Sequence, residues 1–314
     1  MNIKIGITGA NGFIGTLLAN KHIALGDKVK ILSRKDTTKL KDVQLCKGDL
    51  SNINSLHAFV KDIDILYHCA AEIIDESKME VTNIFGTENL IKAASGKIKH
   101  WVQLSSVGVY GPIGKGLIRE NQPYNPINAY EKSKLKSDLL VLEASKKQIF
   151  TITIIRPSNV FGASMRNNSL FALIKTIDKG LYFFIGQKGA SANYVTAENV
   201  IEALYLAATN SNAVNKIYNI SDWSSIEDFI GIISKYLKKP VPKYRIPLKP
   251  IVLLAKVTSF IPKNPLTVSR LLAVCNRSKY VVTKIENELN YLQKNTNDDG
   301  LRALVQEYKL IKLI

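Results

Sequence analysis

Three polar side chains of this 314-residue chain have a spacing that suits proton transfer. Tyr130 and Lys134 are four residues apart, so on a helix both side chains lie on one face. A lysine ammonium beside a phenol stabilises the phenolate and lowers the tyrosine pKa toward neutrality, which makes the phenol a workable general acid or base. Ser106, 24 positions upstream, adds a hydroxyl that can hold a substrate oxygen. The three residues predict a catalytic site that moves a proton on or off an oxygen atom.

A glycine-rich turn near the N-terminus is suited to a dinucleotide. Gly9, Gly12 and Gly15 follow an apolar run and open a helical pattern. Gly9 makes the tight turn, Gly12 lets the backbone approach a pyrophosphate, and Gly15 allows close packing of helix on strand. The pyrophosphate would sit on the helix N-terminus, beside Phe13 and Ile14. With the proton-transfer residues, this turn predicts nicotinamide-dependent oxidation and reduction of a carbinol or ketone.

Two cations indicate which nicotinamide cofactor is used. Arg34 and Lys35 end the second expected strand, where an acidic residue usually holds a ribose 2′-hydroxyl. Their positive charge suits a 2′-phosphate instead. We therefore favour NADP over NAD, although both residues also fit as surface cations of a basic protein.

Two short segments, residues 49–50 and residues 70–71, are expected to contribute to the same site. Asp49 is placed to accept hydrogen bonds from an adenine amino group, with Leu50 beside it. Ala70 and Ala71 are small and can pass close to the cofactor. Because all four residues follow strands in the order that a dinucleotide fold requires, we expect them to bind the cofactor.

The pattern around these residues predicts an α/β fold. Short β-branched runs alternate with helical periods, which is typical of a Rossmann-type, doubly wound parallel sheet. Expected strands cover residues 4–8, 28–33, 63–69, 100–105 and 150–155, and expected helices begin near residues 13, 53, 80 and 129. Residues 1–160 are the expected NAD(P)-binding domain. Residues 161–314, rich in proline after position 240, form mainly a smaller, mixed α/β substrate lobe, and segments near 190–222 are expected to return to the first domain.

The composition limits the classes of partner that we expect for this chain. A net charge of +17 points to an anionic partner, but the lysines are scattered without a nucleic-acid motif, so we expect no nucleic acid. Three distant cysteines indicate a reducing cytoplasm, and four histidines without ligand spacing predict no metal. Residues 246–261 are apolar with two lysines, which fits a buried helix or a contact with the inner face of a membrane. The sequence leaves open whether the protein forms a homodimer.

Seven short motifs, spread over residues 8–162, together resemble one family. They are TGANGFIG (8–15), GDL (48–50), HCAA (68–71), NIFGT (83–87), SSVGVYG (105–111), YEKSK (130–134) and RPSNVFG (156–162). The chain resembles the extended short-chain dehydrogenase/reductase superfamily, and within it the nucleotide-sugar epimerase/dehydratase group. The resemblance assigns catalysis to Ser106, Tyr130 and Lys134. It also implies that Asn83, Ser105, Pro157 and Ser158 lie at the cofactor, with Tyr130 and Lys134, and that Asn159 contacts a substrate diphosphate.

Departures from the family pattern narrow the chemistry. Dehydratases of the family carry an Asp-Glu pair where this chain has Val107 and Gly108, so elimination is disfavoured and Val107 is expected only to line the substrate site. Many nucleotide-sugar epimerases have an arginine near Asn193 that pairs with the diphosphate. Arg277 or Arg166 is the expected substitute in this chain.

We therefore expect an NAD(P)-dependent enzyme that acts at C4 of a diphosphate-linked sugar in O-antigen or capsule synthesis. The carrier is a nucleotide or a polyprenyl lipid, since the second lobe is similar to enzymes of surface-polysaccharide assembly. Arg34 favours a 4-keto-reductase, and the second lobe favours a 4-epimerase. A steroid- or flavonoid-type alcohol dehydrogenase is a second possibility, against which the basic charge argues. A non-enzymatic, cofactor-sensing module is a third, against which the presence of both Tyr130 and Lys134 argues.

Overall fold

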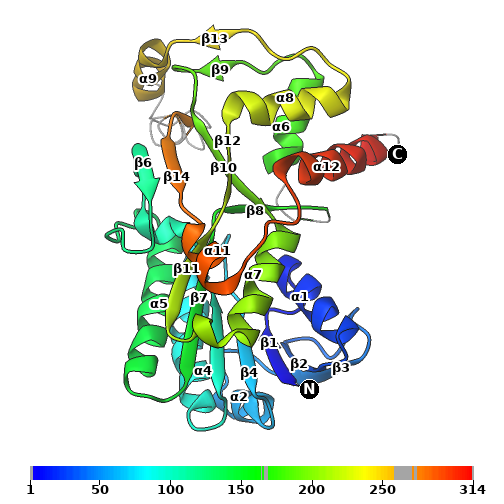
Figure 1. Cartoon of the computed structure of the whole chain (residues 1–314), viewed down its shortest axis with the longest axis vertical. Coiled ribbons are helices and arrows are strands. Elements are labelled where there is room, and N and C mark those ends of the chain that lie inside the picture. The colour runs from blue at the N-terminus through cyan, green and yellow to red at the C-terminus, as the bar shows by residue number, and fades with distance from the viewer. Residues whose placement is uncertain (1–2, 164, 166–168, 258–270, 272–273, 313–314) are drawn as a thin grey trace.

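A seven-stranded parallel sheet forms the lower half of the molecule in the computed structural model (Figure 1). The structure describes residues 3–163, 165, 169–257, 271 and 274–312. The strand order is β11-β7-β5-β4-β1-β2-β3, and each neighbouring pair is parallel. The strands are β1 (Lys4–Thr8), β2 (Lys28–Ser33), β3 (Val43–Lys47), β4 (Ile65–His68), β5 (His100–Leu104), β7 (Thr151–Pro157) and β11 (Lys216–Ile220). The predicted Rossmann-type α/β fold is confirmed.

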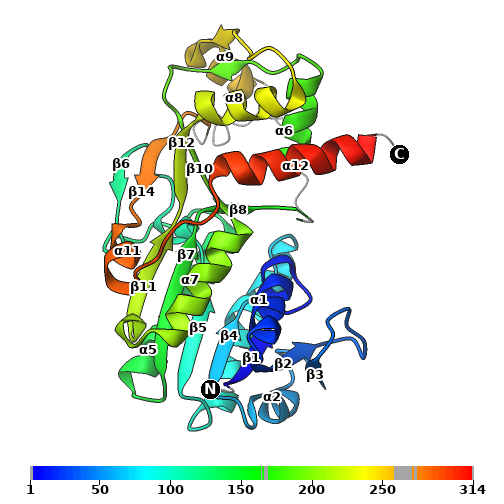
Figure 2. The same ribbon diagram turned by 45° about the vertical axis from the view of Figure 1, so that its right-hand side comes forward.

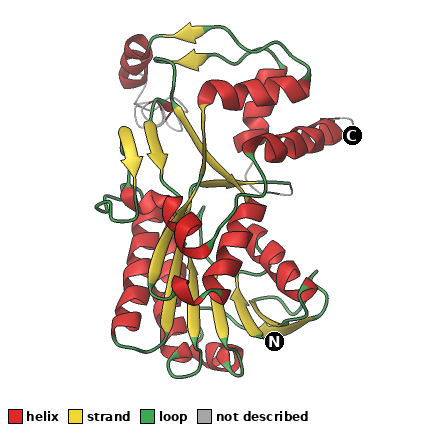
Figure 3. Ribbon diagram, viewed as in Figure 1, coloured by secondary structure: helices red, strands yellow, loops and turns green. Residues whose placement is uncertain are grey.

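Helices cover both faces of this sheet because its strands are apolar on both sides. One buried cluster joins the sheet to α1 (Phe13–Ala24) and α7 (Ala197–Thr209). The other joins it to α2 (Ile53–Val60), α4 (Gly86–Ala94) and α5 (Ala129–Lys146). Figure 3 shows these helices on either side of the strands. The strand order reverses between β1 and β4, which is where a doubly wound sheet binds its ligand.

Several element boundaries differ from the sequence expectation. β4 begins at Ile65, two residues later than predicted, and β7 continues to Pro157. The helix expected near residue 80 begins at Glu76 with α3 (Glu76–Met79), continues as the π-helix η1 (Glu80–Phe85), and leads into α4. Two elements lie within residues 190–222. α7 packs on the large sheet, and β11 is one of its strands. The domain boundary at residue 160 stays a prediction.

The upper half of the molecule consists of short strands and helices (Figure 2). Its strands form three small sheets, β12-β10-β8, β13-β9 and β14-β6. A third buried cluster holds together three of its helices, α6, α8 and α12. The elements not yet given are η2 (Val107–Tyr110), β6 (Lys115–Ile118), β8 (Asn159–Phe161), α6 (Ser169–Asp178), β9 (Phe184–Ile185), β10 (Ser191–Thr196), η3 (Ser211–Ala213), β12 (Asp222–Ser225), α8 (Ile226–Leu237), β13 (Arg245–Ile246), α9 (Leu248–Val257), β14 (Arg277–Tyr280), α11 (Thr283–Leu289) and α12 (Asn297–Lys312). Among the described residues, no helix has the length and apolar character needed to cross a membrane.

A buried histidine ties the ligand-binding edge of the sheet together. His68 Nδ1 lies 2.7 Å from Thr8 Oγ1, and its Nε2 lies 2.9 Å from Thr87 Oγ1. Burial lowers the pKa of His68 to about 3, and the charge of Lys134 acts in the same direction. The ring is therefore neutral in the folded protein at pH values where it is protonated in the unfolded chain.

We predict an acid-sensitive stability from this histidine. Below pH 6.5 the His68 ring binds a proton in the unfolded chain but not in the folded protein. The free energy of unfolding therefore falls as pH falls from 6.5 toward 3. When the pH is lowered from 7 to 5, this histidine should reduce the free energy of unfolding by about 2 kcal/mol. Urea unfolding at both pH values should therefore show a smaller loss in His68→Gln than in the wild type. The exposed His57, changed to Gln, is the matched control. An unchanged pH slope in His68→Gln would contradict this role.

Candidate active site

Ser106 and Tyr130 are brought together by a tight turn and a capped helix. Ser106 follows β5 and caps η2, where its Oγ accepts a hydrogen bond from the Gly108 amide at 3.1 Å. Tyr130 lies in the first turn of α5, which Asn128 caps by accepting from the Glu131 amide at 2.9 Å. The Ser106 side chain lies close enough to Tyr130 to act on the pKa of its phenol. Two of the three residues expected to be catalytic therefore lie near each other.

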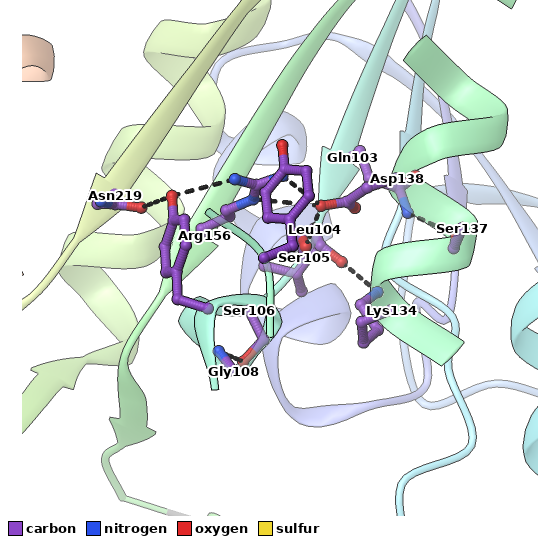
Figure 4. Close-up of polar contacts among 12 residues, drawn as sticks. Gln103, Leu104, Ser105, Ser106, Gly108, Lys134, Ser137, Asp138, Arg156 and Asn219 are labelled. Carbon is purple, nitrogen blue, oxygen red and sulfur yellow. Dashed lines mark hydrogen bonds and ion pairs between the residues drawn. The ribbon is translucent and has the colours of Figure 1, made fainter. Parts of the chain in front are cut away.

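Lys134 is buried one turn along α5. Its Nζ donates to the carbonyl of Leu104, the last residue of β5, at 2.5 Å (Figure 4). Burial lowers the pKa of Lys134, although the nearby Asp138 carboxylate acts in the opposite direction. The lysine thus joins α5 to the strand that leads to Ser106.

The expectation that Lys134 lowers the pKa of Tyr130 is wrong for the protein alone. Burial raises the pKa of Tyr130 to about 12, and the negative charges of Asp138 and Glu131 raise it further, against a small opposite effect of the Ser106 hydrogen bond. The reason is that the lysine ammonium is held at the Leu104 carbonyl while the phenol is removed from water. At neutral pH the phenol therefore carries its proton.

A buried ion pair that the sequence analysis missed stands behind these residues. Arg156 on β7 donates to Asp138 Oδ2 from Nη2 at 3.0 Å, and both side chains are fully buried. The same carboxylate oxygen accepts from Ser105 Oγ at 2.7 Å. Figure 4 shows Arg156 between Asp138 and the strand that carries Asn219. Asp138 lies four residues after Lys134, so one face of α5 carries the tyrosine, the lysine and the carboxylate.

Two tyrosine rings complete the surroundings of the buried arginine. Arg156 Nη1 donates to Tyr110 Oη at 3.0 Å and Nη2 donates to Tyr124 Oη at 3.1 Å, and the guanidinium lies over both rings. Tyr110 in turn donates to Asn219 Oδ1 on β11 at 2.9 Å. Because Tyr110 belongs to η2, these contacts fix the turn that begins at Ser106.

The glycine turn lies where β1 meets the end of β4. Gly9 has a φ of +73°, and a Cβ there would lie 2.6 Å from the Ala70 amide nitrogen. A Cβ on Gly15 would lie 2.2 Å from the Gly9 carbonyl oxygen, so both glycines are required by packing. A Cβ on Gly12 would meet only the Gly9 oxygen, at 3.0 Å, among the described residues. Gly12 is the N-cap of α1 and provides no side-chain cap, and Phe13 and Ile14 lie in the first turn of this helix.

The predicted adenosine residues lie at the ends of β2 and β3. Asn11 of the glycine turn donates to Ser33 Oγ at 3.0 Å, which brings Arg34 and Lys35 beside that turn. Asp49 Oδ1 accepts from the Ser51 amide and hydroxyl at 2.8 and 2.7 Å, so part of this carboxylate caps its own turn. Burial acts to raise the pKa of Asp49, but the Ser51 hydrogen bonds and the Arg34 charge outweigh it and lower that pKa.

Asn83 is held by protein groups. Its Nδ2 donates to the Glu72 carbonyl and to Ser133 Oγ, both at 2.9 Å, and its Oδ1 accepts from the Glu72 amide. Since Ser133 lies between Tyr130 and Lys134, Asn83 anchors the catalytic turn of α5. Its expected place at the nicotinamide stays a prediction.

Ser158, at the end of β7, is the clearest unsatisfied group on this edge of the sheet. The residue is buried beside Pro157, and Ser158 Oγ has no hydrogen-bond partner within the described part of the chain. A buried hydroxyl without a partner costs free energy, so a polar ligand group at this position would stabilise it. The uncapped N-terminus of α1 and this serine hydroxyl suit the two ends of a dinucleotide.

The predicted substrate residues are less closely grouped. Val107 is buried in η2, next to Ser106. Asn159 is exposed and donates to the Asn193 carbonyl on β10 at 3.1 Å. Arg277 on β14 donates to the Lys188 carbonyl at 3.0 Å, and Arg166 lies outside the described residues. Over the described ranges, no group of three or more His, Cys, Asp or Glu side chains is placed to hold a metal ion.

Comparison with protein families decides the identity of this site. The model of the NAD dependent epimerase/dehydratase family matches residues 5–221. The chain belongs to this family. It is therefore an enzyme of the extended short-chain dehydrogenase/reductase type that uses NAD(P).

Individual relatives of this family member cover most of its length. It is 27% identical to N-acetyl-alpha-D-glucosaminyl-diphospho-ditrans,octacis-undecaprenol 4-epimerase of Escherichia coli O157:H7, over 98% of this chain and 95% of the relative. It is 30% identical to the decarboxylating sterol-4-alpha-carboxylate 3-dehydrogenase of Dictyostelium discoideum, over 75% of this chain and 76% of that protein. Its fold matches that of UDP-glucuronic acid 4-epimerase from Bacillus cereus, solved with NAD, with a TM-score of 0.77, 22% identity and coverage of 98% and 99%.

Proposed function

We propose that this enzyme interconverts the C4 epimers of a sugar carried on a diphosphate group. The observation that carries the proposal is that the side chains of Tyr130 and Ser106 lie close together, with Lys134 one turn along the same helix. A phenol paired with a second hydroxyl can hold a carbinol oxygen and move its proton. The similarity to the Escherichia coli epimerase over 98% of the chain supports the choice of C4 and of a diphosphate carrier.

The cofactor residues follow from the ligand-binding edge of the sheet. We propose that the pyrophosphate lies at Gly9, Gly12, Phe13, Ile14 and Gly15, and the adenosine at Arg34, Lys35, Asp49 and Leu50. The nicotinamide half would lie along Ala70, Ala71, Asn83, Ser105, Tyr130, Lys134, Pro157 and Ser158. The uncapped N-terminus of α1 and the unpartnered hydroxyl of Ser158 support this placement.

Each catalytic residue has one task in this proposal. Tyr130 Oη gives or takes the proton of the C4 hydroxyl, and Ser106 Oγ holds the same oxygen. Lys134 keeps the catalytic turn of α5 against β5 through the Leu104 carbonyl. When bound, the nicotinamide accepts and returns a hydride, and its oxidised ring brings a positive charge. Because the pKa of Tyr130 is about 12 in the protein alone, the phenol would take the C4 hydroxyl proton only with such a positive charge nearby.

The substrate carrier and the setting are proposed from the relatives and the charge. We propose a polyprenyl-diphosphate N-acetylhexosamine, used in surface-polysaccharide synthesis such as O-antigen, with a nucleotide sugar as the alternative carrier. Val107 and Asn159 would line the sugar-diphosphate site, with Arg277 or Arg166 as the cation. An enzyme acting on a lipid-linked sugar works in the cytoplasm at the inner face of the membrane, by peripheral contact. Assembly as a homodimer is part of the same proposal.

A 4-keto-reductase is the second candidate, favoured by Arg34. This cation stands beside the glycine turn, where it suits the 2′-phosphate of NADP. We predict that Arg34→Asp shifts the ratio of NADP to NAD affinity at least about tenfold toward NAD, since one charge-assisted contact is lost and one repulsion is gained. Fluorescence titration with both cofactors measures the ratio, and Lys39→Asp, an exposed neighbour, is the control. An unchanged ratio would remove the reason to favour NADP.

One incubation separates the two candidates. The purified enzyme is mixed with N-acetylglucosaminyl-diphospho-undecaprenol in detergent, and in parallel with UDP-N-acetylglucosamine, and the released sugars are analysed. The proposed function predicts the C4 epimer from the lipid-linked sugar without net consumption of NADPH. Epimer formation only from the nucleotide sugar would change the carrier. Absence of the epimer from both sugars, with equal consumption of NADPH when a 4-keto sugar is supplied instead, would replace the epimerase by the reductase.

A further inference from the structure

Acidic residues are absent from a long part of the second half of the chain. Between Asp228 and Glu286 the sequence has twelve Lys or Arg residues and no Asp or Glu. Residues 238–257 alone carry six of these cations. The described part of this segment, with β13 and α9, lies at the end of the molecule farthest from the large sheet (Figures 1 and 2). Lys239 and Arg245 pair with Asp178 and Glu227, so the described part of this segment brings its excess positive charge to one end of the protein mainly through Lys238, Lys243 and Lys249.

The same end exposes large apolar side chains. β9 and β13 pair in parallel, with Phe184 opposite Arg245, and these two residues face each other on the inner side of the ribbon. Phe183 and Tyr244 directly precede the two paired strands. Phe183 is 42% and Tyr244 is 82% exposed.

The helix that follows continues this character. Along α9, Lys249, Leu253 and Val257 recur every four residues and so form one stripe. Leu253 is 65% and Val257 61% exposed, whereas Ala255 is buried. Lys243 and Lys249, which flank β13, are exposed as well. Exposed apolar side chains mixed with lysines are the composition of a surface that lies in the interface of an anionic bilayer.

We infer that the exposed residues that precede β9 and β13 and the outward stripe of α9 dock on an anionic lipid bilayer. Phe183, Tyr244, Leu253 and Val257 enter the headgroup region, and Lys243 and Lys249 meet the lipid phosphates. This inference rests on the proposed function for its use, since a polyprenyl-linked sugar is presented only at a membrane. A nucleic acid would meet the same charge, but it gives no reason for apolar side chains on the surface.

Vesicle sedimentation of the full chain tests the inference without any turnover. The protein should bind vesicles of phosphatidylcholine mixed with phosphatidylglycerol, and binding should weaken with salt and without phosphatidylglycerol. Leu253→Asp should lower the partition coefficient at least about tenfold, since an apolar side chain that enters the bilayer is replaced by a charged one. Lys243→Ala with Lys249→Ala should lower it on the order of twentyfold.

Matched variants on the other half of the molecule serve as controls. Leu292→Asp changes an equally exposed leucine beside α7, and Lys28→Ala with Lys41→Ala removes two exposed lysines near the large sheet. Both controls should bind vesicles like the wild type. Equal binding by Leu253→Asp and the wild type, or binding of the lysines to duplex DNA with none to vesicles, would overturn the inference. Vesicle binding by a protein that epimerises no sugar would support this inference and overturn only the proposed function.

Discussion

Replacement of Tyr130 by Phe is expected to lower turnover by about 10²–10⁴-fold while cofactor affinity changes little. The change removes only the hydroxyl, which lies close to the Ser106 side chain. The ring remains to fill the same space, so the first turn of α5 should keep its place. Turnover of the lipid-linked sugar and fluorescence titration of the cofactor measure the two quantities separately.

Tyr205→Phe is the control for this variant. Tyr205 lies on α7, where Lys21 packs over its ring, and it takes no part in the proposed chemistry. Its loss of a hydroxyl should leave turnover unchanged. Wild-type turnover in Tyr130→Phe, or loss of cofactor binding with the chemistry preserved, would reject the role given to Tyr130.

The second large effect is expected at the buried ion pair. Asp138→Leu removes the carboxylate and leaves the guanidinium of Arg156 buried, which costs about 3–5 kcal/mol of unfolding free energy when a buried pair is broken on one side. Both side chains have no exposed surface, so solvent screens this interaction little. Urea unfolding measures the loss, and Glu88→Gln, which breaks the exposed pair with Lys92 on α4, should change the midpoint little.

The double variant keeps this prediction testable if Asp138→Leu does not fold. With Arg156→Met added, no charge is left buried, so the double variant should be more stable than Asp138→Leu. It should still turn over more slowly than the wild type. Ser105 loses its contact with Asp138 and Tyr110 loses its contact with Arg156, and these contacts hold the turn at Ser106. A double variant that is less stable than the single one would mean that the pair is not the unit that stabilises this region.

Local patterns were sufficient to predict the α/β fold and the helix that carries Tyr130 and Lys134. The glycine turn predicted the tight turn after β1 and the close packing of α1 on this strand, since Gly9 and Gly15 have no room for a side chain. The spacing of Tyr130 and Lys134 predicted one helix face, which α5 provides. These features depend on neighbours in the sequence, and local rules describe such neighbours well.

Features that depend on distant residues could not be predicted in this way. The partner of Lys134 is a backbone carbonyl 30 residues upstream, and no residue type announces it. The pair of Asp138 and Arg156 joins a helix to a strand across the sheet. A signal did exist, since Asp138 is one turn beyond Lys134 and Arg156 opens the RPSNVFG motif, but only the tertiary structure joins them. The raised pKa of Tyr130 likewise follows from burial, which a spacing does not reveal.

The hydrogen on C4 of the sugar gives the most direct test of the proposed chemistry. N-acetylglucosaminyl-diphospho-undecaprenol that carries deuterium at C4 is incubated with the enzyme in ordinary water, and the released sugar is analysed by mass spectrometry. We predict that the C4 epimer forms with its deuterium retained, and that Tyr130→Phe forms almost none. Formation of the epimer with loss of the deuterium to water would contradict the proposal, because C4 would then exchange its hydrogen with solvent through a protein base.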